Sequence, residues 1–277
     1  MEGLTAVSRF LDPYGSSFYD FLAGRGPEPL PQAPPIGSQP AASGAPGTSG
    51  LPAVPHGTTV LAIRFQGGVL MAGDRQATEG VQVSGRRIDK VFKADEHSAI
   101  AIAGAAGPAL ELARLFQVEL EHYEKLEGDM LSCEGKANKL SQMVRGNLPM
   151  AFQGLVVIPL FAGYDLKRRE GRIFKYDVTG GRYEETEYHA TGSGGKDARD
   201  TMKQMYRRGL TEAQALRIAL EALYNAAEED VGTGGPDLVR GIYPTVKVIT
   251  DAGIRDMEES KIGEGCSALI AERRERV

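Results

Sequence analysis

Cysteine, excess positive charge and long apolar runs are all scarce in this sequence. Only Cys133 and Cys266 occur among its 277 residues, and neither has a His or Cys nearby at metal-ligand spacing. A disulfide framework and a zinc site are therefore not expected. Lys and Arg together number 32 against 37 Asp and Glu, so the chain lacks the basic character of a nucleic-acid-binding protein.

The segment MEGLTAVSRF at the amino terminus has an early acid, no basic region and no long apolar run. It therefore resembles neither a secretory signal nor a membrane span. We expect a cytoplasmic protein without a membrane partner, without a cofactor and without a metal. The apolar and charged fractions, 42% and 25%, are typical of a soluble globular protein.

Proline, glycine, alanine and serine dominate the chain before Thr58. Ten of the 15 prolines lie there, and residues 24–57 form a tract that cannot build a packed core. Residues 1–57 are therefore predicted to be a largely disordered leader. The aromatic segment FLDPYGSSFYDFLAG within it is either a short amphipathic docking piece or a sticky part of a flexible tail.

Regular structure is predicted from Thr58 onward, because alternating and helical apolar patterns begin there. Strands are expected over 58–65, 68–74, 87–94, 98–104, 154–165, 171–185 and 187–194, with a hairpin over 245–258. Helices are expected over 108–128, 133–148, 196–208 and 211–229. A charged tail follows at the carboxyl end, and its last residues, ERRERV, are expected to be helical and solvated. This order indicates an α+β fold in which two sheets pack face to face with helix pairs outside, a four-layer αββα sandwich formed by residues 58–277.

Gly57-Thr58-Thr59 marks the boundary between leader and domain. A threonine hydroxyl is a weak nucleophile that needs a base, and the α-amine of an amino-terminal threonine can be that base. This amine has a pKa near ~8, whereas the same nitrogen in a peptide bond has no basicity. Cleavage after Gly57 would therefore activate Thr58. On these three residues alone, the simpler interpretation that β-branched residues start a strand is favoured.

Six further segments point to a family: TTVLAIRFQGGVLMAGDRQAT, GRRIDKVFK, IAGAAG, ELEHYEKLEG, GSGG and EEDVGTGGPDLVRGIYPT. Through them the sequence, from Thr58 to about Ala271, resembles the β subunits of the 20S proteasome, of the bacterial type found in actinobacteria. The resemblance implies the fold of the N-terminal nucleophile hydrolases and autocatalytic removal of residues 1–57 as a propeptide. It also implies a threonine-type endopeptidase that works through an acyl-enzyme intermediate.

The resemblance assigns the nucleophile to Thr58 and its acidic and basic partners to Asp74 and Lys90. The chemistry suits these residue types, because an ammonium at Lys90 held by Asp74 would lower the pKa of a nearby hydroxyl and keep the α-amine neutral enough to act as a base. Without the resemblance, a surface salt bridge of little energetic value would be the favoured interpretation of this pair.

Further site residues are implied in the same way. The amide of Gly104 would stabilise the oxyanion, and Ser193, Asp230 and Thr233 would orient the amine through hydrogen bonds. An extended substrate would pair its backbone with the segment around Thr78 and the edge at Gly104. The first specificity pocket would be formed by Ala77, Ile88, Ile102 and Ala106, and these apolar residues predict cleavage after hydrophobic residues.

Two positions depart from the pattern of the family. Gln76 stands where arginine is common and Gly195 where a second serine is common, which leaves the fine tuning of the site open. The segment TGSGGKD is not a phosphate-binding loop, because Ala190 and Asp197 occupy positions that require Gly and Ser or Thr. Any dependence on ATP would therefore come from a partner.

The resemblance implies two stacked seven-membered β rings between rings of proteasome α subunits. A ring ATPase would unfold protein substrates tagged with a small ubiquitin-like modifier and feed them to the enclosed sites. Two alternatives stay open. One is an N-terminal nucleophile amidohydrolase of small amides, and the other is a non-catalytic ring subunit kept for assembly.

Overall fold

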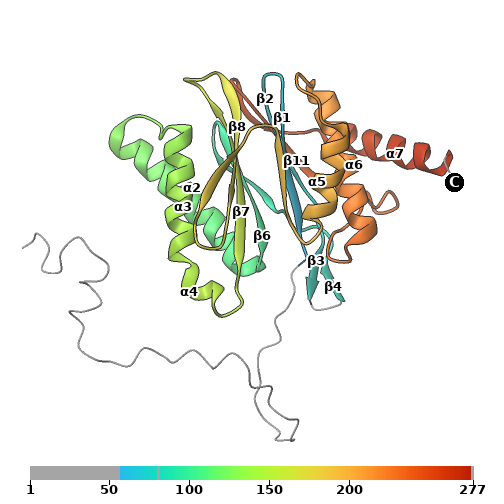
Figure 1. Ribbon diagram of the computed structural model, residues 1–277, viewed down its shortest axis with the longest axis horizontal. Coiled ribbons are helices and arrows are strands. Elements are labelled where there is room, and N and C mark those ends of the chain that lie inside the picture. Colours follow the sequence, from blue (N-terminus) through green and yellow to red (C-terminus); the bar gives the residue numbers. More distant parts are fainter. Residues whose placement is uncertain (1–56, 80–81, 276–277) are drawn as a thin grey trace, which may run out of the picture. The chain divides into compact units, whose positions relative to one another are not determined.

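The computed structural model of the chain describes residues 57–79 and 82–275 (Figure 1). The predicted disordered leader comprises residues 1–57, and all of it except Gly57, including the aromatic segment, lies outside this part of the chain.

Two antiparallel sheets face each other in this part of the chain (Figure 1). The first has the strand order β10–β1–β2–β11–β12, with bounds β1 Thr59–Phe65, β2 Gly68–Gly73, β10 Tyr188–Gly192, β11 Thr245–Thr250 and β12 Gly253–Asp256. The second has the order β5–β6–β7–β8–β9, with bounds β5 Val91–Asp95, β6 Ser98–Gly104, β7 Val157–Asp165, β8 Glu170–Tyr176 and β9 Arg182–Glu185. A separate short hairpin joins β3 (Ala77–Glu79) to β4 (Gln82–Gly85).

Helices cover the outer face of each sheet. The second sheet carries α2 (Ala106–Glu127) and α3 (Cys133–Gly146), and the short α4 (Leu148–Ala151) follows them. The first sheet carries α5 (Gly195–Met205) and α6 (Glu212–Glu229), and α7 (Glu259–Glu275) packs against α6. The predicted α+β sandwich of four layers, αββα, is therefore confirmed.

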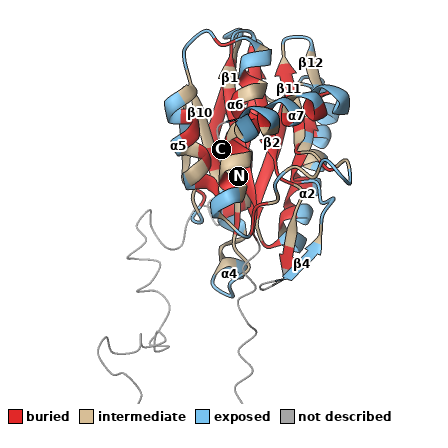
Figure 2. Ribbon diagram, turned by 90° about the vertical axis from the view of Figure 1, so that its right-hand side faces the viewer, coloured by how far each residue is buried: buried red, intermediate tan, exposed pale blue. Residues whose placement is uncertain are grey.

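Apolar residues form three buried clusters, one between the sheets and one under the helices on each side. Figure 2 shows that the strands are mostly buried. Because successive side chains of a strand point to opposite faces, Val60 and Ala62 of β1 pack between the sheets while Leu61 and Ile63 pack under the helices. All four are fully buried. Both faces of β1 are thus covered, so the start of this strand is buried.

Two elements differ from the prediction. The carboxyl end was expected to be a charged, solvated tail, but residues 259–275 form α7, in which Ile262, Cys266 and Leu269 are buried. Their spacing places them on one face of a helix whose other positions are mostly polar, so the charged residues concealed the apolar stripe. The β3–β4 hairpin was also missed, because its strands are short and β4 is mostly exposed.

Candidate active site

Thr58 immediately precedes β1, and its residue surface is only 5% exposed. The peptide bond from Gly57 to Thr58 is intact in this structure, and the Thr58 hydroxyl donates a hydrogen bond to the Gly57 carbonyl at 2.7 Å. The Thr58 amide donates to Oγ of Ser193 at 3.2 Å, and the Ser193 amide donates to the Thr58 carbonyl at 2.9 Å. The hydroxyl therefore lies directly against the peptide bond between Gly57 and Thr58.

Gly57 has no space for a side chain. A Cβ at this position would lie 2.0 Å from Cα of Gly232, a distance that no real contact adopts. The Gly57 amide donates to the Thr78 hydroxyl at 2.9 Å, and its carbonyl accepts from Nζ of Lys90 at 3.3 Å. Hydrogen bonds from the N–H and to the carbonyl of Gly57 thus hold the peptide bond between Gly57 and Thr58 in one place.

Asp74 and Lys90 form an ion pair in the interior rather than on the surface. Nζ of Lys90 lies 2.7 Å from Oδ1 of Asp74, and the two side chains are 7% and 0% exposed. Burial lowers the pKa of Lys90 below its ordinary value, and the neighbouring carboxylates of Asp74 and Asp230 oppose this effect. Desolvation is the larger of the two influences, so the Lys90 ammonium loses its proton at a lower pH than a lysine in water does.

Three backbone amides complete the surroundings of the Asp74 carboxylate. The amide of Thr59 donates to one oxygen at 2.8 Å, and those of Gln76 and Gly234 donate to the other, each at 3.0 Å. With Lys90, four donors therefore compensate the buried charge. The side chain of Gln76 adds a hydrogen bond of 2.9 Å to the carbonyl of Val231.

Ser193, Asp230 and Thr233 form a second polar group beside Thr58. Ser193 lies between β10 and α5, and Asp230 is the residue that ends α6. The hydroxyls of Ser193 and Thr233 both donate to Oδ2 of Asp230, the latter at 2.6 Å. The Gly232 amide donates to the other carboxylate oxygen at 3.1 Å. The three side chains named from the sequence therefore contact one another and reach Thr58 through Ser193.

Gly104 ends β6 in a conformation that favours glycine. Its φ is 122°, and a Cβ would lie 2.1 Å from the carbonyl oxygen of Val156. The neighbouring Ala105 donates its amide to the same oxygen at 2.9 Å. Because α2 begins at Ala106, Gly104 lies where strand β6 turns into the helix and faces the cavity beside Thr58.

A cavity of about 280 Å³ opens beside Thr58. Two of the candidate catalytic residues, Thr58 and Lys90, line it. All the residues expected to bind substrate line it as well: Ala77, Thr78, Ile88, Ile102 and Ala106. Sequence reasoning missed further lining residues, among them Phe92, Ala109 and Leu110. Their signal was present, because Phe92 follows Lys90 by two residues along the chain and Leu110 lies one helical turn after Ala106.

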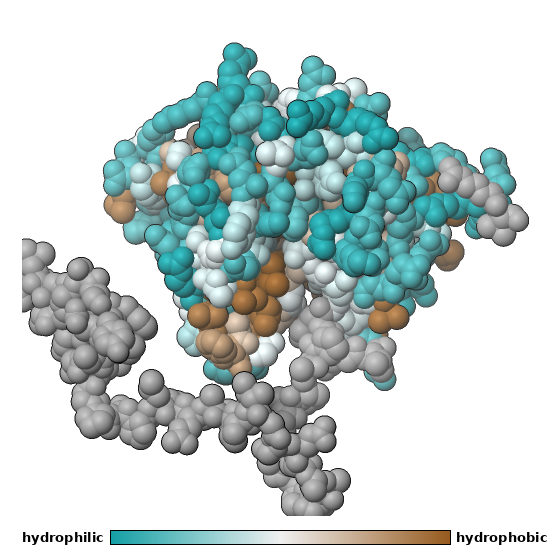
Figure 3. Space-filling model, viewed as in Figure 1, coloured by the Kyte–Doolittle hydropathy of each residue, from teal (hydrophilic) through white to brown (hydrophobic). Residues whose placement is uncertain are grey.

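Apolar side chains are also exposed in the region of α4. The region of α4 carries Met150 and Phe152, of which Phe152 is 84% exposed, and Figure 3 shows apolar atoms along this lower edge. Val156, a few residues further on, contacts Gly104 and Ala105 through its carbonyl group. The exposed apolar side chains of Met150 and Phe152 are therefore close in sequence to Val156, whose carbonyl lies against Gly104 and Ala105.

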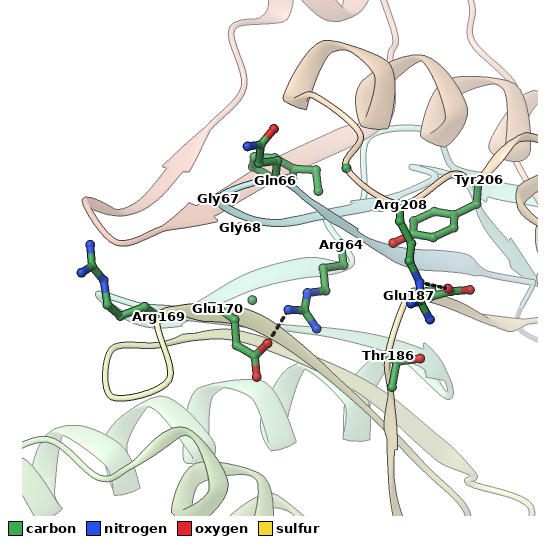
Figure 4. A pocket seen from close by; sticks show the side chains of 13 residues that line it. Arg64, Gln66, Gly67, Gly68, Arg169, Glu170, Thr186, Glu187, Tyr206 and Arg208 are labelled. Atoms are coloured by element: carbon green, nitrogen blue, oxygen red, sulfur yellow. Dashed lines mark hydrogen bonds and ion pairs between the residues drawn. The ribbon is translucent and has the colours of Figure 1, made fainter.

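A larger cavity of about 620 Å³ lies at the far end of β1 and has a different character (Figure 4). Arg64 there pairs with Glu170, and Arg208 pairs with Glu187. None of the residues that the sequence assigned to the site lines it. Its charged groups largely satisfy each other.

Within 57–79 and 82–275, no three His, Cys, Asp or Glu side chains are grouped so that they could hold a metal ion. In the same ranges, no helix combines the length and apolar character needed to cross a bilayer.

Comparison with known proteins identifies the family. A family model described as proteasome subunit matches residues 54–239. The chain is 53% identical over 270 residues to the proteasome subunit beta of Streptomyces griseus, covering 96% of this chain and 92% of that protein. It is 60% identical over 223 residues to the proteasome subunit beta of Acidimicrobium ferrooxidans, covering 80% and 82% of the two chains. A third, from Acidothermus cellulolyticus, is 53% identical over 270 residues and 95% of this chain.

The α+β sandwich and these matches define the general class of the protein, which is that of the threonine proteases. The chain belongs to the proteasome subunit family and is a subunit of a proteasome core. The resemblance to actinobacterial β subunits, inferred from six segments of the sequence, is thereby confirmed.

Replacing Asp74 with Asn should strongly destabilise this region. The substitution turns one acceptor oxygen into a donor that faces backbone N–H groups, and it leaves the buried Lys90 without a counter-charge. We expect the free energy of unfolding of the full chain, measured by urea denaturation, to fall by about 3–5 kcal/mol. The control Glu121→Gln removes the exposed pair with Lys125 and should leave that energy almost unchanged. Equal effects of the two variants would contradict a buried, fully hydrogen-bonded pair.

Proposed function

We propose that the chain is the proteolytic subunit of a 20S proteasome and that Thr58 is its nucleophile once cleavage after Gly57 has made it the amino terminus. One observation carries the proposal: the Thr58 hydroxyl lies 2.7 Å from the Gly57 carbonyl oxygen, and Nζ of the buried Lys90 lies 3.3 Å from the same oxygen. Nucleophile, target bond and a positive charge are thus within contact of one another.

Removal of residues 1–57 follows from this arrangement as an autocatalytic step. Oγ of Thr58 attacks the carbonyl carbon of Gly57, the hydroxyl proton passes to the Thr58 nitrogen, and the bond from that carbon to that nitrogen breaks, which leaves an ester on Oγ and a free amine. Water then hydrolyses the ester and releases the leader with a carboxylate at Gly57. The Lys90 ammonium favours the attack, because it is near the oxygen on which negative charge develops.

The new amine then acts as the base for substrates. Ser193 donates its proton to Asp230, so its oxygen is free to accept an N–H of the Thr58 amine and to orient it. The amine takes the hydroxyl proton as Oγ attacks the peptide carbonyl, and the amide of Gly104 stabilises the oxyanion. The peptide C–N bond then breaks, and the protonated Thr58 amine gives its proton to the departing amino group. Water hydrolyses the acyl-enzyme that results, and Thr233 supports Asp230 throughout.

Substrates bind as extended peptides that pair with the segment at Thr78 and with the edge at Gly104. The side chain before the cut enters the cavity of about 280 Å³, where Ala77, Ile88, Ile102 and Ala106 offer apolar contacts. Phe92 and Leu110 line the same cavity and extend its apolar surface. Hydrophobic residues are therefore favoured at that position.

Assembly would control which proteins reach this site. We infer two stacked seven-membered β rings between rings of proteasome α subunits, in the cytoplasm. A ring ATPase feeds them with unfolded proteins that carry a small ubiquitin-like modifier. The proteins to which the chain is similar are named proteasome subunit beta, which supports the α and β assembly.

Thr58→Ala tests the proposed nucleophile. In particles assembled with the α subunits, this variant should keep its leader and should lose hydrolysis of a fluorogenic peptide, because both reactions need the hydroxyl. Intact mass and peptide turnover measure the two outcomes, and Thr58→Ser, which retains a hydroxyl, should still remove its leader. A non-catalytic ring subunit would show no change in either measurement, which would sink the proposal.

A panel of fluorogenic peptides tests the specificity. Peptides with a large hydrophobic residue before the cut should give the highest kcat/KM, because burial of apolar surface in the cavity favours them by about 0.8 kcal/mol per CH₂ group. Faster cleavage after Arg or Asp would refute the assignment of this cavity. Hydrolysis of small amides in place of peptides would favour an amidohydrolase.

A further inference from the structure

Thr59, the second hydroxyl of the segment Gly57-Thr58-Thr59, has no part in the mechanism above. Its β-branched side chain suits the first position of β1, but strand propensity does not explain its hydrogen bonds. The residue is completely buried. Its hydroxyl lies 2.6 Å from the Thr233 hydroxyl and accepts the Gly194 amide at 3.0 Å.

The direction of these hydrogen bonds follows from their partners. The Gly194 N–H can only donate, so the Thr59 oxygen accepts from it. The Thr233 hydroxyl donates to the carboxylate of Asp230 at 2.6 Å, because an ionised carboxylate can only accept. The Thr59 proton is therefore directed to the oxygen of Thr233, and the order of donors is Thr59, Thr233, Asp230.

Thr59 also connects the two polar groups of the site. Its amide donates to Asp74 at 2.8 Å, the carboxylate that holds Lys90. Its hydroxyl reaches Asp230 through Thr233 and supports the amide of Gly194, the residue next to Ser193. One residue thus fixes the ion pair on one side of Thr58 and the amine-orienting groups on the other.

Gly194 is shaped to admit this contact. A Cβ at Gly194 would lie 2.6 Å from the Thr59 hydroxyl oxygen and 2.8 Å from that of Thr233. Only glycine therefore leaves room for the two hydroxyls to meet beneath the turn between β10 and α5. Without the Thr59 hydroxyl, the buried Gly194 amide would lose its acceptor, and the turn that carries Ser193 would lose an anchor.

We propose that the Thr59 hydroxyl is a positioning group for the reaction at Thr58, which holds Ser193 and Thr233 in the arrangement that orients the amine. The inference rests on the proposed function of Thr58 as an amino-terminal nucleophile. Thr59 does not line the cavity beside Thr58, so its loss should slow bond cleavage without weakening peptide binding.

Thr59→Val and Thr59→Ser test the inference. Valine keeps the branched shape and the hydrogen bond from the backbone N–H to Asp74 but lacks the hydroxyl, whereas serine keeps the hydroxyl. Each full chain is assembled with the α subunits, and peptide turnover is divided by the fraction of chains that intact mass shows to begin at Thr58. Thr59→Val should lower kcat about tenfold with KM unchanged, and Thr59→Ser should restore most of it.

Thr201→Val is the matched control. Thr201 is a buried threonine of α5 whose hydroxyl donates to the Asp197 carbonyl at 3.1 Å and accepts from Asn225 at 2.9 Å. The same substitution there removes a similar pair of hydrogen bonds away from Thr58 and should leave kcat unchanged. If Thr59→Val does not assemble, Thr59→Ser and Thr59→Ala replace the comparison, because they differ only by the hydroxyl.

The inference is overturned if Thr59→Val turns over peptide as fast as Thr201→Val, if its loss lies in KM alone, or if Thr59→Ser is as slow as Thr59→Val. Thr58→Ala separates this failure from that of the proposed function. An inactive Thr58→Ala together with a fully active Thr59→Val rejects only the role of Thr59. Activity in Thr58→Ala rejects the nucleophile itself.

Discussion

The carboxylate of Asp74 is the acceptor on which the rest of the site depends. A buried charge is stable only when its surroundings supply hydrogen bonds and an opposite charge. Asp74 obtains them from Lys90 and from the amides of Thr59, Gln76 and Gly234. These donors come from separate segments of the chain, so satisfying one carboxylate draws the end of β2, the start of β1 and the loop after α6 to the same point.

The proposed function also gives a reason why the bond between Gly57 and Thr58 has to be cut. While Gly57 is joined to Thr58, the nitrogen of Thr58 is an amide and cannot accept a proton, although its hydroxyl and its oriented hydrogen bond to Ser193 are already in place. In the function proposed above, the fold therefore supplies the geometry before the base exists. The contacts of Asp74, Asp230 and Thr233 are already formed in the uncleaved chain, and the proposed cleavage would change one functional group beside them.

The layers of the fold could be predicted from the sequence because both faces of each sheet are covered, which gives strands such as β1 continuous apolar runs and helices such as α6 a regular apolar stripe. Prediction failed where burial is limited. The stripe of α7 is interrupted by charges, and the β3–β4 hairpin has few apolar residues. Neither segment carries the strong periodicity on which such predictions depend.

The site could be named only in part. The side chains that the family resemblance assigned, from Asp74 to Thr233, are brought together around Thr58. The amides of Gly232 and Gly234 could not be foreseen, because a backbone N–H has no residue-type signal. Phe92 and Leu110 could have been found from strand and helix spacing around Lys90 and Ala106. The role inferred for Thr59 needed the observed distances, since two adjacent threonines at the start of a strand are unremarkable in sequence.

Newly assembled particles, sampled over time, test most directly whether cleavage after Gly57 activates Thr58. Intact mass gives the fraction of chains that begin at Thr58, and peptide turnover is recorded on the same samples. Turnover is expected to be absent at first and then to rise in proportion to that fraction. Turnover at the full rate by particles in which every chain still carries residues 1–57 would contradict it.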